Sequence, residues 1–134
     1  MSDSAAKASG FQAARILVVD DDPAIRTLLA DALGDEGYDV RDAANGAAAL
    51  SVVSAWRPDL ILLDLMMPVM NGWQFAERYH QLPGDHAPVI AITAAGRGAL
   101  QSVERLGAIT AALAKPLDLS QLHETITAHL RRTA

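Results

Sequence analysis

Carboxylates follow two of the apolar stretches in this chain, and those acids carry most of its chemical information. Ile16–Val19 is followed by Asp20–Asp22, and Leu60–Leu63 is followed by Asp64. A short continuous apolar stretch is typical of a strand buried in a parallel sheet. In open α/β sheets, ligands and chemistry are found at the carboxyl ends of the strands. The sequence therefore predicts several carboxylates at one edge of a sheet.

Further polar residues stand at the ends of later apolar stretches. Thr93 ends one of them, and Lys115 follows another. Clustered carboxylates repel one another unless a cation neutralises them, and oxygen ligands suit a hard ion such as Mg²⁺. A carboxylate is also a feasible nucleophile toward phosphorus. Acids, a hydroxyl and an amine at strand ends together indicate a site for phosphoryl transfer.

Composition limits the classes of protein to consider. The chain has 134 residues, a net charge of −5, 51% hydrophobic residues and no cysteine. This length predicts about one domain. The acidic balance argues against nucleic acid or an anionic membrane surface as a partner. Without cysteine there is no disulfide or thiolate metal site, which fits a cytoplasmic protein, and no apolar stretch approaches the length of a membrane span.

Strand and helix patterns alternate along the chain. Strands are expected at Ile16–Asp20, Asp39–Ala43, Leu60–Asp64, Val89–Thr93 and Ala111–Ala114. Helices are expected from Pro23 to Gly37, from Gly46 to about Trp56, from Gly72 to about Gln81, between Gly98 and Gly107, and after Asp118. Alternation of this kind predicts an α/β fold, with a doubly wound parallel sheet of five strands and five helices.

Two helices have clear signals for their ends and their buried sides. Asp22 before Pro23 is a good N-cap, and either Asp118 or Ser120 is the expected cap of the last helix. The expected buried residues are Ile25, Leu28, Leu29, Ala32 and Leu33 in the first helix, and Leu119, Leu122, Ile126 and Leu130 in the last. Residues 1–14 are small and polar, so we expect a flexible tail before a folded domain of residues 15–132.

Four motifs in order resemble the receiver domain of two-component response regulators. They are ILVVDDD at Ile16–Asp22, LILLDLMMPVMNG at Leu60–Gly72, VIAITA at Val89–Ala94, and Lys115-Pro116. The resemblance implies a flavodoxin-like sheet with strand order 2-1-3-4-5. It also implies a phosphorylatable domain of a phosphorelay that switches protein–protein interactions. Such a domain catalyses its own phosphorylation and dephosphorylation and is not a metabolic enzyme.

The resemblance assigns a role to each candidate site residue. Asp64 matches the phosphoacceptor, and Asp20 and Asp21 match the acidic pair that binds Mg²⁺, with Asp64 and the backbone carbonyl of Met66 as further ligands. Lys115 and Thr93 match the residues that contact the phosphoryl oxygens. The family often has a cis peptide before the proline after this lysine. The implied donor is a histidine kinase or a histidine phosphotransfer protein, and the implied target is a further protein.

The sequence departs from the family pattern before Lys115 and leaves other functions open. The family usually has an aromatic residue three positions before the lysine, where this chain has Ala112. A haloacid-dehalogenase-type phosphohydrolase is an alternative, because Asp20 and Asp22 have its spacing, although its Gly/Thr-rich stretch and cap domain are missing. A flavodoxin-like flavin site would need a phosphate loop where three acids stand. A non-phosphorylated pseudo-receiver would not need the full set of catalytic residue types.

Overall fold

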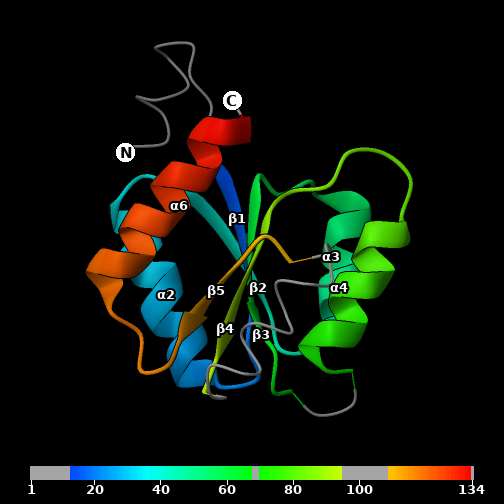
Figure 1. Cartoon of the computed structure of the whole chain (residues 1–134), viewed down its shortest axis with the longest axis horizontal. Coiled ribbons are helices and arrows are strands. Elements are labelled where there is room, and N and C mark those ends of the chain that lie inside the picture. The colour runs from blue at the N-terminus through cyan, green and yellow to red at the C-terminus, as the bar shows by residue number, and fades with distance from the viewer. Residues whose placement is uncertain (1–12, 68–69, 95–108, 134) are drawn as a thin grey trace.

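The fold is a five-stranded parallel sheet with helices on both faces (Figure 1). A computed structural model describes residues 13–67, 70–94 and 109–133. The strands are β1 (Arg15–Val19), β2 (Asp39–Ala43), β3 (Leu60–Asp64), β4 (Val89–Thr93) and β5 (Ala111–Ala114). The helices are α2 (Pro23–Asp35), α3 (Gly46–Ala55), α4 (Gly72–Gln81) and α6 (Leu119–Thr133). The strand order is β2-β1-β3-β4-β5, as the family resemblance implied.

Side chains at the strand-to-helix turns begin the helices that return across the sheet. Asp22 caps α2 by accepting a hydrogen bond from the Ala24 amide, and Asn45 caps α3 in the same way. Asn71 and Gln74 form a reciprocal capping box at the start of α4. These caps satisfy amide groups that have no partner within the helix. They also fix the turns at the carboxyl edge of the sheet, where the acidic residues lie.

Two apolar layers hold the sheet between its helices. The central strand β3 is buried along its whole length, as expected for a strand covered on both faces. One layer joins the sheet to α2 and α6 through Leu29, Leu33, Leu122 and Ile126. The other lies on the side of α3 and α4 and includes Ala49 and Phe75. Figure 1 shows the two helix pairs on opposite sides of the sheet.

Two of the expected core residues are exposed instead. Leu28 in α2 is 48% exposed and Leu119 in α6 is 44% exposed. The apolar series on each helix is wider than the strip that touches the sheet, so a residue at its margin faces solvent. Asp118 accepts hydrogen bonds from the Ser120 and Gln121 amides, so it, and not Ser120, caps α6.

Some expectations fall on parts of the chain that lie outside the described residues. They include the helix between Gly98 and Gly107, and nearly all of the expected tail, since the description begins at Ala13. The described residues contain four helices. None of these helices has the length and apolar character needed to cross a membrane.

Candidate phosphoryl-transfer site

Three carboxylates converge at the carboxyl edge of the sheet. Oxygen atoms of Asp20, Asp21 and Asp64 all lie within 4.8 Å of one another. The strands β1 and β3 pair in parallel with Val19 opposite Leu63, so Asp20 and Asp64 follow at the same level. Asp20 is 2% exposed and Asp64 is 3% exposed, whereas Asp21 is exposed to solvent. The sequence prediction of an acidic cluster is therefore confirmed.

The loop that carries Asp20 and Asp21 is held by hydrogen bonds. The Asp22 amide donates to Oδ1 of Asp20 at 2.9 Å. The Arg26 guanidinium donates to the backbone carbonyl of Asp20 at 2.8 Å and pairs with Asp42 at 3.2 Å. Sequence reasoning missed Arg26. Its position four residues after the helix cap Asp22 was the available signal, because that spacing returns a side chain to the start of the helix.

Asp64 is a buried carboxylate with a partly compensated charge. The Met66 amide donates to its Oδ1 at 3.0 Å. Burial raises the pKa of Asp64 above its usual value, and the nearby Asp20 and Asp21 raise it further. The Met66 hydrogen bond and the Lys115 charge act in the opposite direction on this pKa. Neutralising cations therefore favour the ionised form of Asp64 that a nucleophile requires.

Lys115 bridges the two buried acids. Its Nζ lies 3.5 Å from Asp64 and 3.6 Å from Asp20, and its side chain is 27% exposed. The Lys115 amide donates to the carbonyl of Thr93 at 2.9 Å, which ties the ends of β4 and β5 together. The peptide bond between Lys115 and Pro116 is cis. A single lysine thus lies between the acid that follows β1 and the acid that ends β3.

Thr93 and Met66 lie at the same edge. Thr93 ends β4, is fully buried, and follows Ile92, which pairs with Asp64. Met66 is 65% exposed, so its thioether extends into solvent while its amide binds Asp64. The residues that the sequence singled out therefore lie at neighbouring strand ends, as parallel pairing requires.

The four histidines make no comparable site among the described residues. His123 pairs with Glu36 at 3.0 Å on the surface, and His86 binds the carbonyl of Leu82. His80 packs against His86 with tilted rings whose centroids lie 5.2 Å apart. His80, His86 and His123 therefore have surface or packing roles.

Comparison with known proteins identifies the family. The model of the response regulator receiver domain matches residues 16–127. Sporulation initiation phosphotransferase F of Bacillus subtilis is 38% identical over 117 residues, which is 87% of this chain and 93% of that protein. The sensor histidine kinase RcsC of Escherichia coli is also 38% identical over 117 residues, but this chain spans only 12% of its length.

A solved structure extends the likeness to three dimensions. The crystal structure of a CheY-like receiver domain protein from Methanospirillum hungatei matches with a TM-score of 0.80 and 32% identity. The match covers 90% of this chain and 96% of that one. The family model, the relatives and the solved structure point to the same family. The chain belongs to the response regulator receiver domain family and is a phosphorylatable receiver of two-component signalling.

Proposed function

We propose that Asp64 is the residue that accepts the phosphoryl group. The observation that carries this assignment is the position of Lys115, whose Nζ lies within 3.6 Å of both Asp64 and Asp20. A carboxylate held beside a cation can attack phosphorus without a large charge penalty. In the reaction, an Asp64 oxygen forms the new bond to phosphorus as the bond from phosphorus to the donor histidine nitrogen breaks. The electron pair of that bond stays on the imidazole, which then takes up a proton.

The acidic cluster suits a magnesium ion. Asp20, Asp21 and Asp64 offer carboxylate oxygens, and the backbone carbonyl of Met66 would supply a further oxygen. Mg²⁺ in proteins is bound through few carboxylates together with phosphate oxygens. When bound, the ion would neutralise charge on the phosphoryl oxygens. Asp20 and Asp21 hold negative charge at this position, and the Arg26 and Asp22 contacts keep the Asp20 loop in place.

Lys115 and Thr93 complete the proposed set. Lys115 would exchange its contact with the Asp64 carboxylate for a contact with the oxygens of the phosphoryl group. A fixed positive charge at that position stabilises the transferring group. Thr93 ends the strand next to Asp64, and its hydroxyl would donate to a phosphoryl oxygen. Positioning and charge stabilisation account for most of the catalysis in phosphoryl transfer, and these two residues would contribute to both.

The proposed donor is a histidine kinase or a histidine phosphotransfer protein, and the output is contact with another protein or onward transfer of the phosphoryl group. We infer a cytoplasmic domain of residues 15–132 that uses neither nucleic acid nor membrane as a partner. It would catalyse its own phosphorylation and dephosphorylation without being a metabolic enzyme.

The donor is tested by phosphotransfer from purified, labelled histidine kinases in the presence of Mg²⁺. At least one kinase should transfer label to the parent chain and none to Asp64→Asn. Turnover of a generic phosphomonoester would instead favour a phosphohydrolase. Failure of every kinase and of acetyl phosphate to label the chain would favour an interaction module that is never phosphorylated.

A further inference from the structure

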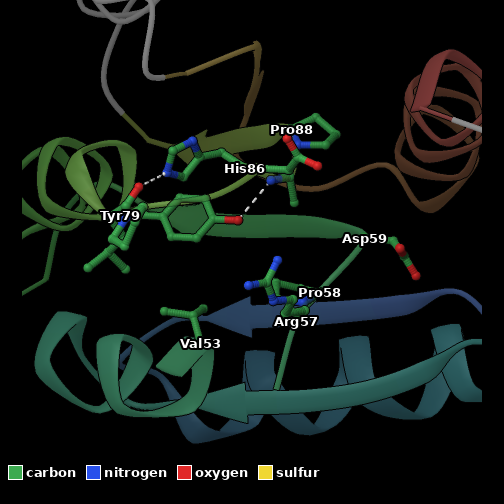
Figure 2. Close-up of a pocket in the computed structure, with 11 residues that line it drawn as sticks. Val53, Arg57, Pro58, Asp59, Tyr79, His86 and Pro88 are labelled. Atoms are coloured by element: carbon green, nitrogen blue, oxygen red, sulfur yellow. Dashed lines mark hydrogen bonds between the residues drawn. The ribbon is translucent and has the colours of Figure 1, made fainter. Parts of the chain in front are cut away.

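A cavity of about 340 Å³ opens at the edge of the sheet opposite to the acidic cluster. It lies between the ends of α3 and α4 and the segments that lead into β3 and β4 (Figure 2). Pro58 and Asp59 precede β3, whereas Asp64 ends that strand. The cavity is therefore separated from the phosphoryl-transfer site by the length of β3, and its residues have no role in the function proposed above.

The guanidinium of Arg57 is directed into this cavity (Figure 2). None of the ion pairs among the described residues includes Arg57. Its nitrogens lie 3.6 Å from the point where a side chain at Gly84 would begin, so the group reaches toward the Pro83–Gly84 turn. A guanidinium carries five N–H donors in a planar fork that matches a carboxylate. Arg57 thus supplies a positive charge and several free donors to the cavity.

The hydroxyl of Tyr79 points toward the same space (Figure 2). The ring is 6% exposed, and its oxygen accepts a hydrogen bond from the Ala87 amide at 2.8 Å. Burial raises the pKa of Tyr79 above its usual value of 10.0, so the hydroxyl keeps its proton at neutral pH. The oxygen uses its acceptor capacity on Ala87, and its hydrogen can be donated to a ligand.

Apolar side chains and one imidazole also line the cavity. Val53, Leu82 and Pro88 form walls. His86 packs edge-on against Tyr79 with ring centroids 5.2 Å apart. Its Nε2 lies 2.6 Å from the carbonyl of Leu82, so this nitrogen donates its proton there. Apolar walls with a few convergent polar groups are typical of small-molecule sites.

Two acids line the cavity, and one of them limits the charge of a ligand. Asp59 accepts a hydrogen bond from the Arg15 amide at 2.8 Å, and its carboxylate points away from Arg57 and Tyr79 (Figure 2). Asp85 also lines the cavity and is exposed. One guanidinium can balance one negative charge, and the Asp85 carboxylate on the lining would disfavour a multiply charged phosphate.

We propose that this cavity binds a small organic monocarboxylate with an aliphatic or aromatic body. The carboxylate would pair with the Arg57 guanidinium and accept the Tyr79 hydroxyl hydrogen, and the body would contact Val53, Leu82 and Pro88. The volume is at the lower end of the range of about 300–1,000 Å³ for small-molecule sites, which fits a small ligand better than a nucleotide. Binding here does not depend on phosphorylation of Asp64.

The test uses benzoate and 3-phenylpropionate as carboxylate probes. Their binding is monitored through amide chemical shifts in ¹H–¹⁵N NMR spectra. At least one probe should cause saturable shifts at Ala87, whose amide bonds the Tyr79 hydroxyl, and at Arg57. Benzamide has the same body without the charge and should bind at least about tenfold more weakly, because charge-assisted hydrogen bonds are the stronger ones. Benzamidine, which carries the opposite charge, should bind no better than benzamide.

Two matched variants assign the binding to Arg57. Arg57→Gln should lower the affinity for the carboxylate probe by about tenfold or more. Arg78→Gln removes the same charge from an exposed position on α4 that does not line the cavity, and it should bind like the parent. The proposal is overturned if neither carboxylate gives saturable shifts up to about 10 mM. It is also overturned if benzamide binds as well as benzoate, or if Arg57→Gln keeps the parent affinity.

Discussion

Gly72 lies directly against the backbone of Asp64. A Cβ atom at Gly72 would be 2.6 Å from the carbonyl oxygen of Asp64 and 2.7 Å from the Cα of Leu65. The Gly72 amide also donates to the carbonyl of Leu65 at 3.1 Å. The start of α4 therefore rests on the main chain of the proposed phosphoacceptor, and only glycine leaves room for this approach.

Gly72→Ala should destabilise the protein by about 1–3 kcal/mol, because main chain must move to admit the methyl group. The same substitution at Gly34 is the control. Nothing lies within 4 Å of a Cβ at that helical position, so Gly34→Ala should stabilise by about 0.5–1 kcal/mol. Urea unfolding measures both. If Gly72→Ala is as stable as the parent, the close packing on Asp64 is wrong.

Asp21→Ala should greatly weaken Mg²⁺ binding, measured by calorimetry, and slow phosphorylation by acetyl phosphate. The metal-free variant should be at least as stable as the parent, because it removes one of the mutually repelling carboxylates. In the variant, the pKa of Asp64 should fall, since Asp21 contributes to its rise. Asp35→Ala, an exposed acid at the end of α2, controls for net charge. Labelling of Asp21→Ala at the parent rate would refute the metal role.

Tyr79→Phe should remove the hydrogen bond to the Ala87 amide and destabilise the protein by about 1 kcal/mol near neutral pH. The pKa of Tyr79 is raised in the folded state above 10.0, so folding favours the neutral phenol. The stability that this hydroxyl contributes is fully present below 10.0, the pKa of tyrosine in the unfolded state. It is lost as the pH rises through the higher pKa of the folded state. The difference in the free energy of unfolding between parent and variant, measured by urea titration, should therefore become smaller at alkaline pH. A constant difference would contradict the burial of this hydroxyl.

Met66→Asn combined with Ala95→Glu should shorten the lifetime of the aspartyl phosphate. The parent has an exposed thioether beside Asp64, which cannot orient a water for attack as an amide can. Ala95 lies outside the described residues. The change should be about tenfold, equal to ~1.4 kcal/mol of barrier. Loss of label after removal of the donor gives the rate, and Met66→Leu is the control. A parent that loses its phosphoryl group within seconds would contradict this reasoning.

Strand ends were the part of the site that the sequence could predict. Asp20, Asp64 and Lys115 each follow an apolar stretch, and parallel pairing brings such ends to one edge whatever the details of packing. The strand limits also followed from pattern, because strands such as Leu60–Asp64 are buried throughout and lie between turn residues. The family resemblance supplied the strand order.

Contacts that depend on packing distances could not be predicted. The approach of Gly72 to the backbone of Asp64 joins residues whose types alone do not signal a contact. The cavity beside Arg57 and Tyr79 likewise forms where two helix ends and two strand starts meet. Leu28 was wrongly placed in the core because periodicity gives the direction of a face but not its width.

The identity of the phosphoacceptor is tested most directly by intact-mass analysis after incubation with acetyl phosphate and Mg²⁺. The parent should gain one phosphoryl group, and Asp64→Asn should gain none. Asp59→Asn makes the same change at an exposed residue before β3, at the opposite edge of the sheet, and should be labelled like the parent. NMR spectra of both variants check that they are folded. A folded Asp64→Asn variant that is labelled as fully as the parent would contradict the account.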